Sequence, residues 1–307
     1  MSGVECDAYG RLIDVMLRAG EPPAGAFAYR LLVPVDGSAA SFSALQVAAR
    51  IADSKPGAEL HLLNAQVVLG SSPDGEALLH HGFDDTIDAR AMLDEAGMPY
   101  LLHLTTGNAA AAVVSHTREH GISEIVMGAD GAGSVAGALL GSTAMAVVRE
   151  AGAPVTLVKS GSGAGLFPAE WFDWLVAFDG SDTSQRAMRH VLQHLPVSSD
   201  GPRVHLLNVQ APVGTSAARA IGSAGVREQA ELECGPALRA LDEAGIDHDF
   251  HVATGDAVTK ILEVAKSTGC GHIAMGSRGL GWLESVMLGS VSSGVLRRTE
   301  IPVTLVK

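Results

Sequence analysis

Residues 153–159 read Ala-Pro-Val-Thr-Leu-Val-Lys, and residues 301–307 read Ile-Pro-Val-Thr-Leu-Val-Lys, 148 positions further on. The Leu-Asp-Glu-Ala-Gly of residues 93–97 recurs at residues 241–245 with the same separation. The Asp-Gly-Ser of residues 36–38 recurs at residues 179–181, at a separation of 143. Self-similarity at a nearly fixed period is the signature of duplicated structural units. The sequence therefore predicts two similar units in tandem.

Within each unit, short apolar runs alternate with amphipathic helical patterns. In the first unit we expect strands over residues 30–35, 59–65, 100–104, 124–128 and 155–159. We expect helices between them, over residues 38–52, 84–96, 109–120 and 142–150. Strands that are almost wholly apolar and alternate with helices indicate a parallel sheet covered on both faces. The expected fold class is thus α/β, with a five-stranded parallel sheet sandwiched by helices in each half.

Domain boundaries follow from the repeat. The first domain is expected over residues 29–159 and the second over residues 171–307. Between them, residues 160–170 begin Ser-Gly-Ser-Gly-Ala-Gly, which is the composition of a flexible linker. Residues 1–28 have no counterpart in the second half and form a leader, in which one amphipathic helix is expected over residues 7–18. We assign the leader no chemistry.

The composition excludes several classes of protein. The 307 residues carry a formal net charge of −13, which a general binder of nucleic acid or anionic membranes would not show. Three cysteines, far apart, cannot form a disulfide framework or a four-thiolate zinc site. No apolar stretch approaches the ~18 residues needed to span a bilayer, and the first twenty residues lack the apolar run of a signal peptide. We expect a cytoplasmic protein without a nucleic-acid or membrane partner.

A glycine-rich pattern, G-x2-G-x9-G-S, follows the fourth predicted strand in both halves. Its two copies consist of Gly128, Gly131, Gly141 and Ser142, and of Gly276, Gly279, Gly289 and Ser290. Glycines allow close backbone approach and positive φ, and a helix that opens at the last pair attracts anions with its free N–H groups. The pattern therefore favours a phosphate-binding loop. The alternative is a glycine-rich turn in which the two serines are ordinary N-caps.

Two further positions follow the strands that flank this loop. Asp36 and Asp179 end the first strand of each half, where a carboxylate could accept hydrogen bonds from adenine or ribose, or cap the next helix. Ala65 and Val209 follow the second strand, where a small apolar side chain could flank a base. In open parallel sheets, ligands bind beyond the carboxyl ends of the strands, where the strand order reverses.

With these motifs in both halves, residues 29–307 resemble the universal stress protein family in its tandem form. The resemblance implies two domains of the adenine-nucleotide α-hydrolase-like (HUP-type) fold. It also implies ATP as the ligand, with or without Mg²⁺. The residues implied to hold the nucleotide are Asp179, Val209, Gly276, Gly279, Gly289, Ser290 and Val291 in the second half, and Asp36, Ala65, Gly128, Gly131, Gly141 and Ser142 in the first.

The resemblance also bears on assembly. In this family the last strand commonly pairs with its twin across a dimer. Residues 155–159 and 303–307 could pair in that way within one chain, as an intrachain pseudo-dimer. A homodimer of whole chains stays open.

The two predicted sites differ in charge. Arg278 would add a positive charge beside the phosphates, whereas Asp130, its counterpart, would add a negative one. At ~5 Å and an effective dielectric of ~20, two unit charges interact by roughly 3 kcal/mol, which solvent exposure would reduce heavily. A Mg²⁺ ion held by Asp130 would reverse this order. We expect the second half to bind ATP more tightly.

The expected function is that of a stress-response regulatory protein in which ATP acts as a ligand with little turnover, and not as a substrate. Neither half carries the Walker pattern G-x4-G-K-[ST] or a repeated Ser/His/Asp set, so no catalytic residue is assigned. A slow ATPase or nucleotidyl-transfer enzyme is one alternative. A scaffold protein with vestigial nucleotide clefts is the other.

Histidine pairs offer a competing metal-site interpretation. His116 and His120, in the pattern H-x-x-E-H, share one face of a predicted helix, as zinc ligands would. The repeat places Val264 and Thr268 at these positions, and the helix end lies away from the expected cleft. We therefore expect a solvated helix face there and no designed metal site.

Overall fold

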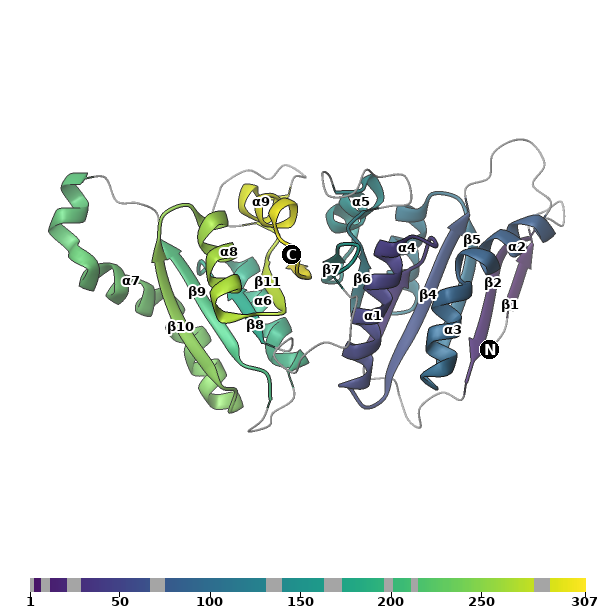
Figure 1. Cartoon of the computed structure of the whole chain (residues 1–307), viewed down its shortest axis with the longest axis horizontal. Coiled ribbons are helices and arrows are strands. Elements are labelled where there is room, and N and C mark those ends of the chain that lie inside the picture. Colours follow the sequence, from purple (N-terminus) through teal and green to yellow (C-terminus); the bar gives the residue numbers. More distant parts are fainter. Residues whose placement is uncertain are drawn as a thin grey trace. The chain divides into compact units, whose positions relative to one another are not determined.

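The computed structural model describes residues 3–6, 12–20, 29–66, 75–130, 140–162, 173–195, 201–210, 215–278 and 288–307. The chain divides into two compact units between Ala164 and Gly165, which lies within residues 160–170. We call them unit 1, Met1–Ala164, and unit 2, Gly165–Lys307. Figure 1 labels the elements of both units.

Unit 1 has the expected parallel sheet at its centre. Its parallel strands are β3 (Tyr29–Pro34), β4 (Ala58–Gln66), β5 (Tyr100–Thr106), β6 (Glu124–Gly128) and β7 (Val155–Val158). They lie in the order β5-β4-β3-β6-β7, so the first strand of the repeat is central and the order reverses beside it. The reversal leaves a crevice at the carboxyl ends of β3 and β6.

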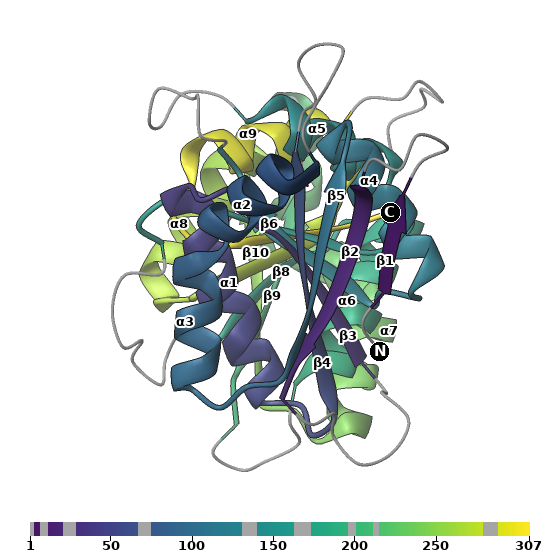
Figure 2. The same cartoon turned by 90° about the vertical axis from the view of Figure 1, so that its right-hand side faces the viewer.

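Helices cover both faces of this sheet. They are α1 (Ala39–Asp53), α2 (Gly75–Asp85), α3 (Ile87–Glu95), α4 (Ala109–Glu119) and α5 (Ser142–Glu150). Helix α1 packs with α3, and α4 packs with α5, on opposite sides of the strands (Figure 2). The side chains of Leu45 and Leu93 fill the space between the α1–α3 layer and Leu31, Leu60 and Leu62 of the sheet.

The helix expected over residues 84–96 is two helices that meet at Thr86. The buried Thr86 hydroxyl donates to the carbonyl of Gly82 at 2.8 Å, and the Thr86 backbone leaves helical geometry at φ −101° and ψ 1°. A β-branched residue whose hydroxyl bonds the preceding turn weakens the continuity of a helix.

The leader is not helical, and the expectation of a helix over residues 7–18 is wrong. Instead, β1 (Gly3–Cys6) and β2 (Leu12–Ala19) form an antiparallel hairpin, and β2 pairs antiparallel with β5 (Figure 2). Val15, Leu17 and Ala19 alternate along β2 and pack against the core of unit 1. A period of two is that of a strand with one buried face, so pairing with the open edge of β5 decides the structure of this segment.

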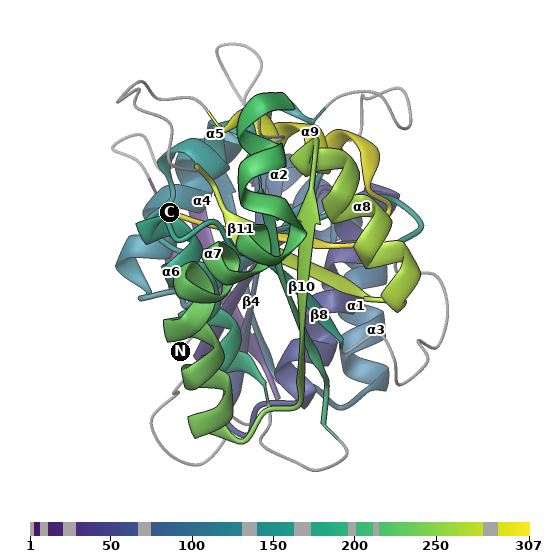
Figure 3. The ribbon, with the colours of Figure 1, turned by 90° about the vertical axis from the view of Figure 1, so that its left-hand side faces the viewer.

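Unit 2 repeats the parallel sheet without the hairpin. Its strands are β8 (Trp174–Ala177), β9 (Val204–Gln210), β10 (His248–Thr254), β11 (His272–Gly276) and β12 (Val303–Val306), in the order β12-β11-β8-β9-β10. Its helices are α6 (Asp182–His194), α7 (Thr215–Ala244), α8 (Ala257–Thr268) and α9 (Ser290–Arg298). Figure 3 shows α6 and α7 on one side of the strands and α8 on the other. Val176, Met188, Val191, Leu206 and Leu241 lie in the core between the sheet and the α6–α7 layer.

The sequence thus predicts the repeated α/β architecture correctly. Among the helices that the structure describes, none combines the length and the apolar character that crossing a membrane requires.

Candidate functional site

A cavity of about 370 Å³ lies at the carboxyl ends of the central strands of unit 1. Five predicted residues of the first half line it together: Asp36, Ala65, Gly128, Gly141 and Ser142. Gly131 lies outside the described residues. Four separate stretches of the sequence therefore contribute to one site, as the position of the strand reversal predicts.

The cavity has an apolar wall that the sequence analysis did not single out. Val35 follows β3, Leu63 and Met127 lie near the carboxyl ends of the strands β4 and β6, and Ala109 and Val113 lie in the first turns of α4. These residues share a position in the fold. Each lies near the carboxyl end of a strand that faces the crevice, or near the start of α4. Flat apolar surfaces of this kind suit a planar ring.

Asp36 and its counterpart Asp179 organise the first helix of each unit. In unit 1, Asp36 Oδ1 accepts from the backbone N–H of Ser38 at 3.1 Å and from its hydroxyl at 2.5 Å. Ser38 is the N-cap of α1, and its hydroxyl oxygen accepts from the N–H of Ser41. Gly37 between them has φ +73°, which favours glycine. The capping role is thus present in the structure.

Unit 2 has the same arrangement. Asp179 Oδ1 accepts from the N–H and the hydroxyl of Ser181 at 3.1 and 2.6 Å, and Gly180 has φ +78°. In the described part of each unit, only Oδ1 of the aspartate is engaged in this way, so Oδ2 is left to accept from a ligand.

The loop glycines that the structure describes do not have the positive φ that we expected. Positive φ occurs at Gly37 and Gly180, whereas Gly141 and Gly289 have φ −58° and −59°. The expected close approach does occur at Gly128, where an added Cβ would lie 3.0 Å from Ala40. This contact is with the first turn of α1, so the glycine lets the strand end meet the next helix.

The last two residues of the pattern begin α5 and α9. Gly141 and Gly289 are the N-cap residues, and neither offers a side-chain cap to the helix. The alternative in which Ser142 and Ser290 are the N-caps is therefore wrong. Both serines lie in the first helical turn and are exposed. A helix start that has no side-chain cap keeps N–H groups available to an external acceptor.

In unit 2 the loop residues are held by hydrogen bonds among themselves. Ser292 Oγ donates to the carbonyls of Gly276 and Ser277 at 3.0 and 3.2 Å, and the N–H of Gly289 donates to the carbonyl of Ser277. The hydroxyl of Thr183 donates to the carbonyl of Arg278. These bonds bring both ends of the loop to the first turns of α6 and α9.

The remaining predicted residues of unit 2 surround that position. Arg278 is exposed, while Val209 and Val291 are partly exposed, at the end of β9 and in the first turn of α9. Gly279 lies outside the described residues.

In each unit the side chains of an Asn–x–Gln motif form hydrogen bonds next to the site. Asn64 Nδ2 donates to the carbonyl of Val35 at 2.8 Å, and Gln66 Nε2 donates to Asn64 Oδ1 and to Asp85. In unit 2, Asn208 donates to the carbonyl of Phe178, and Gln210 donates to Asn208 and Glu233. The amide side chains therefore hold the fold together through these hydrogen bonds. The apolar residue between them, Ala65 or Val209, makes no such bond and can face a ligand in the cleft.

Comparison with known proteins now bears on this arrangement. The model of the universal stress protein family matches residues 29–159 and 174–307. The chain belongs to the universal stress protein family. It has two domains of that family in tandem, with the α/β fold that we expected.

Relatives with curated descriptions agree. A universal stress protein of Mycolicibacterium smegmatis is 27% identical over 303 residues, which cover 91% of this chain and 97% of that protein. One of Mycobacterium tuberculosis is 29% identical over 184 residues, which cover 60% of this chain and 61% of that protein. Among solved structures, a universal stress protein of Archaeoglobus fulgidus matches with a TM-score of 0.65 at 23% identity, covering 91% of this chain and 96% of that one.

In this universal stress protein one matched position of the loop carries opposite charges in the two units. Asp130 lines the cavity of unit 1 beside Asp36, and no cation stands among the residues that line it in the described part of the chain. Arg278 takes the position of Asp130 in unit 2 and, within the described residues, makes no ion pair that would occupy its charge.

The H-x-x-E-H helix face is not solvated, and that expectation is wrong. His116 is 1% exposed and packs against His61 and His103, which are 2% and 7% exposed on β4 and β5. Only His120, at the end of α4, is partly open to solvent. The matching strand histidines of unit 2, His205 and His251, are hydrogen-bonded at 3.1 Å, as expected of structural residues.

Proposed function

We propose that this universal stress protein binds an adenine nucleotide, ATP above all, as a regulatory ligand with little turnover. The observation that carries the proposal is the cavity of unit 1. Predicted residues from four separate stretches of the sequence, among them Asp36, Ala65 and Gly141, line one space of about 370 Å³.

The cavity offers apolar surface in one part and hydrogen-bonding groups in another, which matches the base and the phosphates of a nucleotide. The apolar wall of Val35, Leu63 and Met127 offers surface to a base, and the free Oδ2 of Asp36 can accept from an exocyclic amino group or a ribose hydroxyl. The start of α5, at Ser142, offers N–H groups and the positive end of the helix dipole to phosphate oxygens.

The side chains that line the cavity support a ligand role over rapid turnover. The polar ones are Asp36, Ser41, Asp130, Ser142 and Thr143. Within the described residues this set includes no histidine, lysine or cysteine that could serve as an activated nucleophile or cationic stabiliser.

The acidic residues bear on the form of the nucleotide. Asp36 and Asp130 would repel a bare triphosphate in unit 1, and a divalent ion with oxygen ligands would offset this repulsion. Carboxylate oxygens suit Mg²⁺, so ATP is expected to bind unit 1 as its magnesium complex. Arg278 supplies a positive charge directly in unit 2, which supports tighter binding there.

Thermal unfolding of the full chain with ATP, AMP, NAD or GTP, with and without Mg²⁺, tests the proposal. A ligand that binds only the folded state stabilises it by about 2.7 kcal/mol at a hundredfold excess over Kd. We expect stabilisation by adenine nucleotides and little release of phosphate. Absence of any shift would favour the scaffold alternative, and steady phosphate or pyrophosphate release lost on mutating Gly289 would favour the enzyme.

A charge exchange between the repeats provides the matched control. Arg278→Asp should weaken ATP binding to unit 2 about tenfold, since a reversed charge at this exposed position changes the binding free energy by about 1–2 kcal/mol. Asp130→Arg should strengthen binding to unit 1 and reduce its need for Mg²⁺. If each variant left both affinities unchanged, the loops would not be the phosphate sites.

A further inference from the structure

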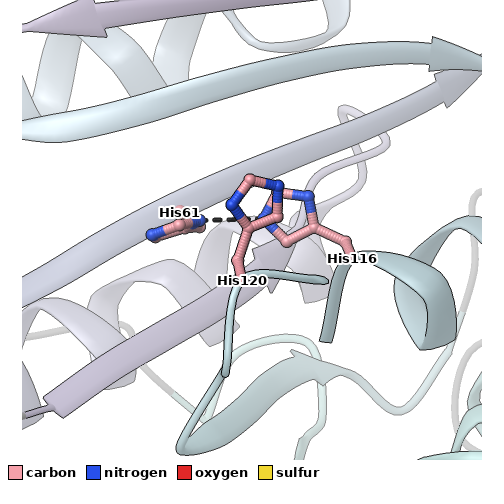
Figure 4. Close-up of side chains that lie close together, drawn as sticks. All are labelled: His61, His116 and His120. Atoms are coloured by element: carbon pink, nitrogen blue, oxygen red, sulfur yellow. Dashed lines mark hydrogen bonds between the residues drawn. The ribbon is translucent and has the colours of Figure 1, made fainter. Parts of the chain in front are cut away.

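Four histidines and two carboxylates gather in unit 1 at the C-terminal end of α4, whose first turns line the cavity. We call His61, His103, His116 and His120 the histidine cluster. His116 stands between the two strand residues, with its Nε2 2.8 Å from His61 Nδ1 and its Nδ1 2.7 Å from His103 Nδ1. Figure 4 shows His61 on its strand facing His116 and His120 at the end of the helix.

Carboxylates close both ends of this row. The outer nitrogen of His103, Nε2, contacts Asp14 of β2. The outer nitrogen of His61, Nε2, lies 3.2 Å from Glu59 Oε2 and is buried without a hydrogen bond of good geometry. A carboxylate on the outer nitrogen of an imidazole fixes its tautomer and raises the basicity of the inner nitrogen, as in carboxylate–histidine–metal arrangements.

With all three imidazoles neutral, the row has one proton fewer than it has contacts. Two carboxylates and three imidazoles make four contacts, and three neutral imidazoles supply three protons. When His103 donates to Asp14 and His116 donates to His103, the proton of His61 fills one of the two remaining contacts. On Nδ1 it donates to His116 Nε2 and leaves His61 Nε2 bare beside Glu59; on Nε2 it leaves the lone pairs of His61 Nδ1 and His116 Nε2 facing each other.

Two facing lone pairs in a buried position repel each other unless a cation lies between them. A metal ion bound by these two nitrogens removes the repulsion, and the proton of His61 then stays on Nε2 beside Glu59.

His120 supplies a third ligand and the route of entry. Its ring stacks on that of His116 with centroids 4.1 Å apart, and it is partly open to solvent. One ligand nitrogen from each of His61, His116 and His120 lies within 4.8 Å of the others. Tetrahedral Zn²⁺ with Zn–N bonds of about 2.0–2.1 Å places its ligand nitrogens roughly 3.3 Å apart, so small side-chain rotations suffice.

In the described part of unit 2, the strand histidines lie beside Asp249 and have no helix histidines next to them. His205 and His251 repeat the strand pair, but Val264 and Thr268 stand where His116 and His120 would be. The strand histidines therefore belong to the common architecture, and the two helix histidines are an addition specific to unit 1.

We propose that the histidine cluster is a binding site for one divalent transition-metal ion of the zinc class, with His61, His116 and His120 as its ligands. Asp14 acts through His103, and Glu59 through His61, as positioning residues. Glu59 is itself held by Arg18 at 2.7 Å. Imidazole ligands select zinc and its neighbours over Mg²⁺ and Ca²⁺.

The test is a Zn²⁺ titration of the chelator-treated full chain at neutral pH, with Co²⁺ absorption as the geometric readout. We expect one tight site per chain. The double variant His116→Val/His120→Thr, which installs the residues of unit 2, should reduce the affinity by at least about 100-fold. His80→Ala/His81→Ala, which removes two exposed neighbouring histidines, should leave it unchanged.

Two further variants separate ligation from folding. His120→Thr keeps the buried row intact and should still weaken Zn²⁺ binding, with melting of the metal-free protein unchanged. Asp14→Asn should weaken binding about 10-fold to 100-fold while the Co²⁺ spectrum keeps its form. Zn²⁺ binding that survives in His116→Val/His120→Thr, or that falls equally in His80→Ala/His81→Ala, would overturn the proposal.

Discussion

At the scale of single residues, glycines that resemble ligand-binding positions also carry the packing of the fold. An added Cβ at Gly276 would lie 2.4 Å from Thr183 Oγ1 and 2.9 Å from the carbonyl oxygen of Arg278. The first half has a looser version, with 3.0 Å between the corresponding position, Gly128, and Ala40. A glycine is therefore required at the end of this strand whether or not a ligand binds.

Gly276→Ala should lower the free energy of unfolding of unit 2 by about 1–3 kcal/mol, because a Cβ there overpacks the contact between β11 and α6. Urea unfolding followed by tryptophan fluorescence measures it, since all three tryptophans belong to the second half of the sequence. Gly152→Ala, at a position with open space, is the control and should stay within about 0.5 kcal/mol by circular dichroism. An unchanged urea midpoint for Gly276→Ala would contradict the packing argument.

At the scale of elements, the two repeats solve one helix-packing problem with different residue pairs. Between α8 and α9, Gly294 faces Val258, and a Cβ on the glycine would lie 2.6 Å from Val258 Cγ2. The repeat places Ala146 and Ala110 at these positions between α5 and α4. A small residue opposite a large one in unit 2 thus replaces two of intermediate size in unit 1.

A double-mutant cycle tests this exchange of volume. Gly294→Ala alone should destabilise unit 2 by about 1–3 kcal/mol through overpacking. Gly294→Ala with Val258→Ala recreates the pair of unit 1 and should recover most of the loss, with a coupling energy of at least about 1 kcal/mol. Tryptophan-monitored urea unfolding of all four chains provides the cycle. Additive effects would show that the two side chains do not compete for the same space.

The repeated elements could be predicted from the sequence because each carries its own signal. Short apolar strands and their helices recur with nearly the same spacing, which gives the sheet, the strand reversal and the cleft at Asp36 and Gly141. The hairpin could not be predicted with the same tools, since its structure depends on the edge of β5. The alternation of Val15 and Leu17 at a period of two was the sequence feature that indicated a strand.

The burial of His116 was missed for a related reason. The pattern of α4 places His116 and His120 on one face, but the sequence does not show that this face meets the strand residues His61 and His103. Comparing the strand histidines across both repeats would have placed them on a common layer. Their contact with the helix needed the tertiary structure.

At the scale of the whole molecule, the hairpin makes the two repeats unequal. In unit 1 it covers β5, whose first five residues are buried, whereas the matching strand β10 of unit 2 is partly exposed along its length. The hairpin also brings Asp14 to His103, so the leader contributes to the histidine cluster.

A chain that starts at Tyr29 should therefore be less stable in unit 1 and more prone to self-association. Removal of residues 1–28 opens the hydrogen-bonding edge of β5 and exposes the apolar area of the core that Val15 covers. Thermal unfolding and sedimentation velocity of the truncated and full chains measure both effects. A truncated chain with the same melting temperature and the same monomer fraction would show that the hairpin is dispensable.

The exposed strand β10 has a consequence for how copies of this chain could join. Among the strands that end the described order of each unit, β10 is the longest with seven residues, whereas β1, β7 and β12 have four each. Strand addition at β10 would pair it with the β10 of a second copy about a twofold axis. Such an isologous contact pairs the β10 edges of both copies with each other. Assembly through this strand therefore stops at a dimer and does not continue as a fibre.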